Sequence, residues 1–314
     1  MRKYVSIVLL FIAAFMMAQN PKREFRGAWI QCVNGQFQGM GRDAMQQTLS
    51  YQLDELQKSG INAIFFQVRA EGDALYASEL EPWSRYLTGQ QGLPPNPYWD
   101  PLEWMVEQCH ARQMECHAWI NPYRAKTKGT AALAKNHAYF RSPGSFFNYE
   151  GLMIFDPGCP ENRDFICQVA ADIVSRYDVD GLHIDDYFYP TKESWFDSIS
   201  FSKSGYSDLS QFRLDNCTKM VYKMYNAVKS HNSTALFGVS AQGNVHNNLN
   251  ELYADVETWS REAGYVDYMA PQIYYGFQNS GQPYAEVVDQ WDEMLRGTGK
   301  KLIPGLAVYK IGAE

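Results

Sequence analysis

Short apolar segments alternate with amphipathic segments along almost the entire chain, and this order limits the fold more than any other feature. Repeated strand-then-helix order is typical of a parallel sheet covered by helices, so it predicts an α/β protein. No glycine-rich phosphate loop follows the first strand, which argues against a dinucleotide-binding fold. We therefore predict a (β/α)8 TIM barrel. The expected strands cover residues 25–33, 62–69, 115–121, 181–187, 235–242, 267–275 and 302–309.

Seven strands are one fewer than a closed barrel of this kind requires. The chain stops at Glu314, soon after the seventh strand, so we expect a barrel truncated at its C-terminal end or containing a strand not recognised here. Residues 152–155 are also strand-like, but a turn follows at 156–158, so we predict that they form a hairpin within a loop. Without a linker or an internal repeat, residues 19–314 are expected to form one catalytic domain.

The N-terminus has the pattern of an export signal. Arg2 and Lys3 precede an apolar run at 5–17, which is too short for a comfortable membrane span, and the small residue Ala18 follows. We predict that residues 1–18 are a signal peptide, that the protein reaches the periplasm or surface of a bacterium, and that no membrane span remains. The chain has a net charge of −7 and no cluster of Lys and Arg, so we do not expect it to bind nucleic acid.

The stretch DGLHIDDYFYP, at residues 180–190, places two carboxylates at the end of a buried strand. Charged groups are rarely buried without a partner or a purpose. Because side chains alternate along a strand, His183, Asp185 and Tyr187 are expected to point into the barrel. Asp186 would point outward unless the strand has already ended. Asp185 is therefore the first candidate for catalysis.

Other expected strands also carry polar or aromatic groups on one face near their C-terminal ends, where TIM barrels build active sites. Each group alone could be a buried core residue with all its hydrogen bonds made. Because all of them converge at one end of the barrel, we predict a functional pocket. The predicted substrate-binding residues are Arg69, His117, Asn121, Tyr123, His183, Tyr187, Gln272 and Tyr274.

Carboxylates and aromatic rings at a barrel mouth fit glycoside hydrolysis. One group must protonate the leaving oxygen, and a second must attack the sugar or activate water. Asp185 is the predicted nucleophile or general base. Its partner stays open among Asp186, Asp73 and Glu71, of which the last two follow the second strand. No nucleophile elbow and no metal-binding pair of His or Cys occurs, so neither a metal nor another cofactor is expected.

Six segments together carry a family resemblance. They are FRGAWI, QVRAEGDALYASELEPWSRYLTG, HAWINPYR, DGLHIDDYFYP, VDYMAPQIYY and PGLAVYKIG. Over about residues 26–312 the chain resembles the bacterial glycosyl-hydrolase-like family 10. The resemblance implies an exported barrel glycosidase of the envelope. One branch of that family cuts peptidoglycan strands already stripped of their stem peptides at the division site, so envelope or division proteins would be partners.

Two wider comparisons refine the candidate acids. Residues 180–185 resemble the D-G-x-R-x-D segment of α-amylases, whose last Asp is the nucleophile, and this favours Asp185. Tyr187 stands where chitinases carry their catalytic Glu, which argues against chitinase-type chemistry. The family pattern differs from this chain at residues 70–71, which favours Asp73 over Glu71. Two other readings stay open: hydrolysis of an α-glucan or another polysaccharide, and a glycan-binding barrel without catalysis.

Overall fold

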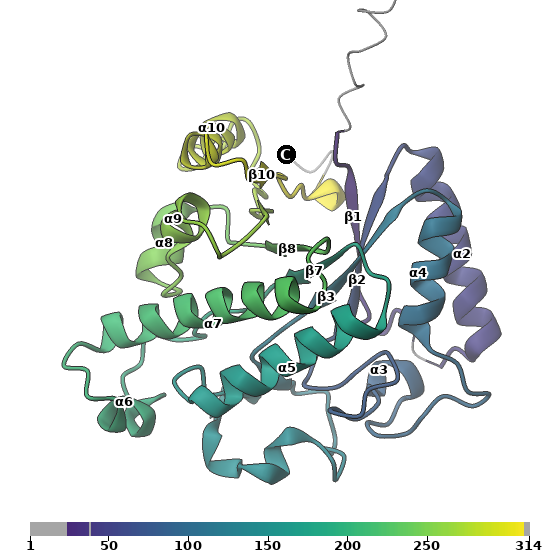
Figure 1. Ribbon diagram of the computed structural model, residues 1–314, viewed down its shortest axis with the longest axis horizontal. Helices are drawn as coiled ribbons and strands as arrows, with labels where there is room; N and C mark the ends of the chain where they lie inside the picture. The colour runs from purple at the N-terminus through teal and green to yellow at the C-terminus, as the bar shows by residue number, and fades with distance from the viewer. Residues whose placement is uncertain (1–23, 38, 311–314) are drawn as a thin grey trace, which may run out of the picture.

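The computed structural model describes residues 24–37 and 39–310, and the predicted signal peptide lies outside this part of the chain (Figure 1). All seven predicted strands occur, each shorter than expected, in one parallel sheet, and the α/β prediction is confirmed. In spatial order they are β1 (Gly27–Ile30), β2 (Ala63–Arg69), β3 (Glu115–Ile120), β7 (Gly181–Ile184), β8 (Leu236–Val239), β9 (Tyr268–Met269) and β10 (Lys301–Leu302).

The sheet curls, but in the described part of the chain it does not close. Strands β1 and β10 lie at its two ends. Strands β9 and β10 are only two residues long, and single bridges from Gln272 to Gln242 and to Gly305 continue the pairing beyond them. These bridges hold the segment after β9 beside its neighbours, at the C-terminal end of the sheet that we call the mouth.

Helices cover the outer face of the sheet, with α5 (Pro160–Arg176) and α7 (Leu209–His231) packed together and α2 (Arg42–Lys58) beside α4 (Pro101–Ala111) (Figure 1). Asp100 caps the N-terminus of α4, since its carboxylate accepts the N–H groups of Leu102 at 3.0 Å and Glu103 at 3.2 Å. No helix in the described ranges is long and apolar enough to cross a membrane. The longer helices are α2 (Arg42–Lys58), α4 (Pro101–Ala111), α5 (Pro160–Arg176), α7 (Leu209–His231) and α10 (Tyr284–Leu295).

The connection between β8 and β9 contains two short helices instead of one long one. The chain forms α8 (Val245–Asn250) and, after a break, α9 (Val256–Arg261). Tyr253 has a φ of 57°, a left-handed conformation that interrupts a right-handed helix. Asp255 then starts α9 by accepting the N–H of Thr258 at 3.0 Å. The remaining short helices are α3 (Arg85–Thr88) and α6 (Ser198–Ser204).

The long connection between β3 and α5 builds a second, antiparallel sheet. Its strands are β4 (Arg124–Lys126), β5 (Phe146–Tyr149) and β6 (Leu152–Phe155), in the order β4-β6-β5. The hairpin predicted at 152–155 is therefore confirmed. Strand β4 begins only a few residues after β3 ends, so it lies close to the mouth. Arg124 and Thr127, in and directly after β4, therefore reach the mouth.

The lower interior of the barrel is filled by rings instead of the usual branched aliphatic residues. Trp29 stacks on Phe65 with centroids 4.5 Å apart, and Tyr268 packs against His117 and His183. Glycines make room for these rings, since a Cβ on Gly238 would lie 2.0 Å from the Tyr268 ring. The polar site begins one layer above these aromatic side chains.

Candidate active site

Asp185 stands at the centre of the mouth. It directly follows β7 and is half-buried. Its Oδ1 accepts the N–H of Asp186 at 2.7 Å and the side-chain amide of Gln272 at 3.2 Å. Burial raises the pKa of Asp185 to about 6, against the opposing influence of Arg124 and Gln272. The group can therefore take or release a proton near neutral pH.

Asp186 also reaches the mouth, because β7 has already ended at Ile184. Its φ of 54° turns the chain, so the strand alternation that would point it outward no longer applies. The side chain, 32% exposed, forms an ion pair with Arg124 and accepts the amide N–H of Asn121 at 3.3 Å. Two neighbouring carboxylates thus meet at one place, one in a half-buried position and one paired with a cation.

A chain of amides fixes this arrangement to the neighbouring strands. The N–H of Cys32 donates to Gln67 at 3.0 Å, and Gln67 donates to the side-chain oxygen of Asn121 at 2.7 Å. Asn121 in turn donates to Asp186. Asn121, a predicted substrate-binding residue, is almost fully buried and acts on the site by orienting Asp186.

Glu71 lies across the mouth but below its surface. It is fully buried, and several donors surround its carboxylate. Burial raises the pKa of Glu71, but the hydrogen bonds from its partners outweigh that effect and hold the pKa below its usual value. As a carboxylate engaged on both oxygens, Glu71 is placed to orient its donors. They are Arg85 at 3.0 Å to each oxygen, the Tyr86 hydroxyl at 2.8 Å, and the hydroxyls of Thr127 and Thr130.

Asp73 sits behind Glu71. Its carboxylate accepts the N–H of Glu71 and the side-chain amide of Gln91, both at 3.2 Å. Burial, and then the nearby charge of Glu71, raise the pKa of Asp73 to about 6. Asp73 can therefore carry a proton near neutral pH, but its side chain is fully buried in this structure.

Arg69 holds two loops together. Its guanidinium donates to both oxygens of Glu81 at 2.7 Å and to the carbonyls of Asn121 at 2.6 Å and Pro122 at 2.9 Å. Both Arg69 and Glu81 are fully buried. The predicted sugar-binding residue thus occupies a structural position under the mouth.

His183 and His117 lie in the aromatic layer below Asp185. Trp29 donates to His183 Nε2 at 3.2 Å, and the Tyr268 hydroxyl is 3.1 Å from His183 Nδ1 and 3.3 Å from His117 Nδ1. Both histidines are fully buried. Burial, and then the neighbouring His117, lower the pKa of His183 well below its usual value, so it is neutral. Their contacts link four strands of the barrel, β1, β3, β7 and β9.

Tyr187 and Tyr123 turn away from the mouth. The Tyr187 hydroxyl donates to Asn248 at 3.4 Å, and its ring packs on Trp259 with centroids 5.4 Å apart. The strand alternation that predicted an inward Tyr187 fails because β7 ends at Ile184. Tyr123 is buried as well.

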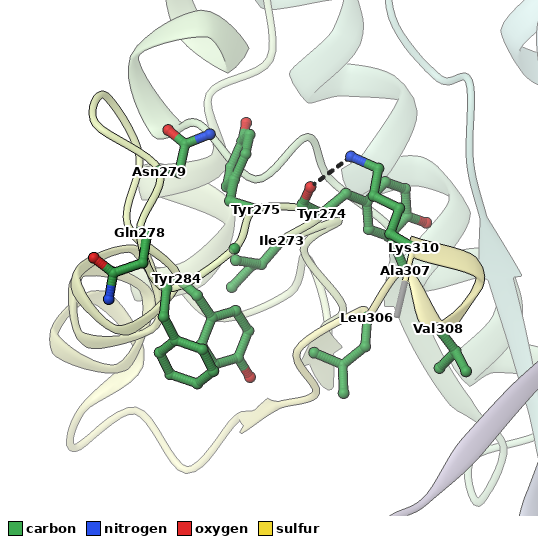
Figure 2. A pocket seen from close by; sticks show the side chains of 12 residues that line it. Ile273, Tyr274, Tyr275, Gln278, Asn279, Tyr284, Leu306, Ala307, Val308 and Lys310 are labelled. Atoms are coloured by element: carbon green, nitrogen blue, oxygen red, sulfur yellow. Dashed lines mark hydrogen bonds between the residues drawn. The ribbon is translucent and has the colours of Figure 1, made fainter. Parts of the chain in front are cut away.

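Gln272 and Tyr274 stay at the mouth as predicted. Gln272 donates to Asp185 and, at 3.3 Å, to the Ser240 hydroxyl. Burial, and then the charge of Asp185, raise the pKa of Tyr274 to about 12. Tyr274 also lines an open pocket of about 730 Å³, in which Tyr284 lies opposite Leu306 (Figure 2). An apolar, tyrosine-lined pocket thus adjoins the carboxylate pair.

A second cavity, of about 360 Å³, opens on the other side of the mouth. Arg85 and Arg124 both line it, and neither was recognised as a site residue from the sequence. The available signal was their place in loops that follow the C-terminal ends of β2 and β3. The lining residues are Val33, Asn34, Gly35, Arg85, Tyr86, Arg124 and Thr127.

Comparison with known proteins identifies the family. Residues 24–314 match the family described as glycosyl hydrolase-like 10. The chain belongs to this family. This chain is 34% identical over 324 residues to glycosyl hydrolase YngK of Bacillus subtilis (strain 168). The alignment covers 95% of this chain and 63% of the relative. The resemblance read from the six sequence segments is thereby confirmed.

A second relative agrees with this membership, and a solved structure shares the fold. Glycosyl hydrolase DigH of Escherichia coli (strain K12) is 35% identical over 295 residues, and the alignment covers 85% of this chain and 66% of the relative. This chain thus spans less than two thirds of the length of either relative. The PgaB (BpsB) glycoside hydrolase domain from Bordetella bronchiseptica superposes with a TM-score of 0.58 at 13% identity, over 86% of this chain and 79% of that one. This likeness supports the TIM-barrel class.

Proposed function

We propose that this chain is a glycoside hydrolase that cleaves a bacterial envelope glycan, namely peptidoglycan strands whose stem peptides have been removed. The observation that carries the proposal is the pair Asp185 and Asp186 at the mouth of a glycosidase-type barrel. Glycoside hydrolysis needs two carboxyl groups beside the scissile bond. Membership of the glycosyl hydrolase-like 10 family and relatives named glycosyl hydrolase support the reaction class.

Asp185 would act as nucleophile or general base. Its Oδ1 already accepts two N–H groups, which leaves Oδ2 as the oxygen for attack on a sugar or for activation of water. With a pKa of about 6, most Asp185 side chains are ionised at neutral pH. Gln272 fixes the orientation of the carboxylate, as an efficient reaction requires.

Asp186 and Asp73 compete for the role of general acid. Asp186 is partly exposed at the mouth but is paired with Arg124, whereas Asp73 has a raised pKa but is buried. Kinetics with aryl glycosides separates them, because a good leaving group needs no protonation. Replacing the true acid by Asn should impair natural glycan cleavage far more than aryl glycoside cleavage. A variant that impairs both substrates equally does not lack the acid.

Purified peptidoglycan tests the substrate. The full chain is incubated with strands that have or have not been treated with an amidase to remove stem peptides, and products are read by mass spectrometry. Release only from stripped strands, lost in Asp185→Asn, is the expected result. Release from an α-glucan instead would replace the proposed substrate. Binding to glycans without any release, unchanged in Asp185→Asn, would favour a non-catalytic glycan-binding barrel.

The proposal includes the place of action. A glycan of the envelope lies outside the cytoplasm, and residues 1–18 have the pattern of an export signal. Mature protein recovered from the periplasm or surface should begin close after Ala18. Full-length protein confined to the cytoplasm would contradict export.

A further inference from the structure

The cavity of about 360 Å³ beside the carboxylate pair has an unusual charge for this protein. The chain as a whole has a net charge of −7, yet both charged side chains that line the cavity are arginines. No acidic residue is among the lining residues, although Glu71 lies buried behind Arg85. A neutral sugar ring would not require two guanidinium groups at this point.

Arg85 is held rigidly in the wall of this cavity. Glu71 accepts two hydrogen bonds from its Nε and Nη2 atoms, and the guanidinium carbon lies 4.1 Å from the centroid of the Tyr86 ring. The side chain remains 21% exposed. A guanidinium fixed in this way loses little freedom when it binds a ligand, so it suits recognition of a planar anion.

Arg124 connects the cavity with the catalytic groups. It lies on β4, is 24% exposed and forms an ion pair with Asp186. Its charge also acts on Asp185, whose pKa it lowers. An anion beside Arg124 would therefore sit next to the scissile bond of a glycan bound at Asp185.

The chemistry of the two arginines favours a carboxylate. Guanidinium groups match the two oxygens of a carboxylate and bind them through paired, charge-assisted hydrogen bonds. The two catalytic aspartates would otherwise repel an acidic substrate, and cations nearby offset that repulsion. Because each arginine already has a carboxylate partner, selection would depend on hydrogen-bond geometry as well as on net charge.

We propose that the cavity between Arg85 and Arg124 is a subsite for a carboxylate carried by the substrate sugar. The inference rests on the proposed function, since it names a recognition element of the same substrate. In peptidoglycan the carboxylate is the lactyl group of N-acetylmuramic acid. That group is amide-linked while a stem peptide is attached and becomes a free anion when the peptide is removed. The subsite would thus distinguish stripped strands from strands that retain their peptides.

Binding of single sugars tests the subsite without turnover. The full chain carrying Asp185→Asn is titrated with N-acetylmuramic acid, N-acetylglucosamine and glucuronic acid, and chemical shifts or heats are recorded. N-acetylmuramic acid should bind at least about tenfold more tightly than N-acetylglucosamine, as one or two charge-assisted bonds imply. Preference for glucuronic acid over N-acetylmuramic acid would assign the subsite to uronic acids. Equal binding of all three sugars would overturn the proposal.

Arg124 variants test whether the Arg124 guanidinium recognises the substrate carboxylate. Arg124→Met should abolish the preference for the acidic sugar, and Arg124→Lys should keep part of it, because Lys retains charge without the planar fork. Arg261→Met, at an exposed ion pair on α9, is the matched control and should keep the full preference. A preference that survives in folded Arg124→Met would contradict the assignment.

Wild-type turnover separates this inference from the proposed function. Stripped strands are compared before and after methyl esterification of their carboxylates. Esterification should raise KM by about tenfold or more and change kcat little. Equal KM values for both substrates would leave the proposed function intact and overturn the subsite. Binding of N-acetylmuramic acid without cleavage of any strand would support the subsite and contradict the proposed hydrolysis.

Discussion

At the scale of single residues, the properties of the site come from what surrounds each carboxylate. Asp185, Asp73 and Glu71 are all acids near the mouth, yet burial raises the pKa of the first two to about 6 while the donors around Glu71 keep its pKa low. Asp185 alone among these three is partly exposed. Partial exposure combined with a pKa near neutrality therefore makes Asp185 the first candidate for nucleophile or general base.

The first prediction concerns the pH dependence of activity. If Asp185 acts as nucleophile or base, kcat/KM should rise with pH on its acid side with an apparent pKa of about 6. Asp185→Asn should lower kcat by about 100- to 10,000-fold. Hydrolysis rates between pH 4 and 9 measure both effects. An acid limb centred near pH 4 would contradict the burial argument.

The same carboxyl should affect stability, with a sign that follows from linkage. Its folded pKa of about 6 exceeds the ordinary value of 3.8, so its contribution to stability is greatest below pH 3.8 and is lost as pH rises through 6. Asp185→Asn removes the cost of burying the ionised group above pH 6. The melting temperature of this variant should exceed that of the wild type at pH 8 and match it near pH 4. A variant less stable at pH 8 would contradict the prediction.

A third prediction tests the buried ion pair of Arg69 and Glu81. Both side chains are fully buried, so Glu81→Gln leaves the charge of Arg69 without its partner. The free energy of unfolding should fall by about 3–5 kcal/mol. Denaturant titration measures it, with Glu55→Gln, at an exposed pair with Lys58, as a control that should change little. Equal effects of both variants would argue against a structural role for Arg69.

At the scale of elements, the ends of the strands decide which side chains reach the mouth. Strand β7 stops at Ile184, so Asp186 turns toward Arg124 and Tyr187 turns toward Asn248. Period-two alternation, which is valid inside a strand, mispredicted Tyr187, whereas Asp186 follows the stated alternative that the strand has already ended. The insertion between β3 and α5 has a similar effect, because β4 carries Arg124 back over the sheet.

A fourth prediction addresses the packing between strands β8 and β9. A Cβ on Gly238 would lie 2.0 Å from the Tyr268 ring, whose hydroxyl contacts both buried histidines. Gly238→Ala should therefore lower the free energy of unfolding by at least about 2 kcal/mol. Gly144→Ala, where nothing lies within 4 Å, is the control and should have little effect. Thermal or denaturant unfolding of both variants checks the difference.

At the scale of the whole molecule, order should decrease from the centre of the sheet toward β10. Strand β2 is fully buried and pairs on both sides, whereas β10 has two residues and ends the sheet. Amide hydrogens of β2 and β3 should exchange by global unfolding and those of β10 by local opening. Hydrogen-exchange mass spectrometry measures this order. Slower exchange in β10 than in β2 would contradict it.

The sequence by itself determined the α/β class, all seven strands of the sheet, the loop hairpin and the position of Asp185 and Gln272 at the mouth. These features depend on local periodicity, helix caps and the rule that parallel strands end on one side, all of which a chain carries in its own order of residues. The break between helices α8 and α9 is not evident from these patterns, since its left-handed residue, Tyr253, has no clear signal in the sequence.

Only the tertiary structure decided the roles of the other polar residues. Arg69, His117 and His183 have the same polar character as Gln272, but their partners come from distant segments and enclose them completely. Arg85 and Arg124 face a cavity because Glu71, 14 residues before Arg85, and Asp186, in a distant segment, orient them. Burial and pairing depend on contacts between segments distant in sequence, and local patterns do not contain that information.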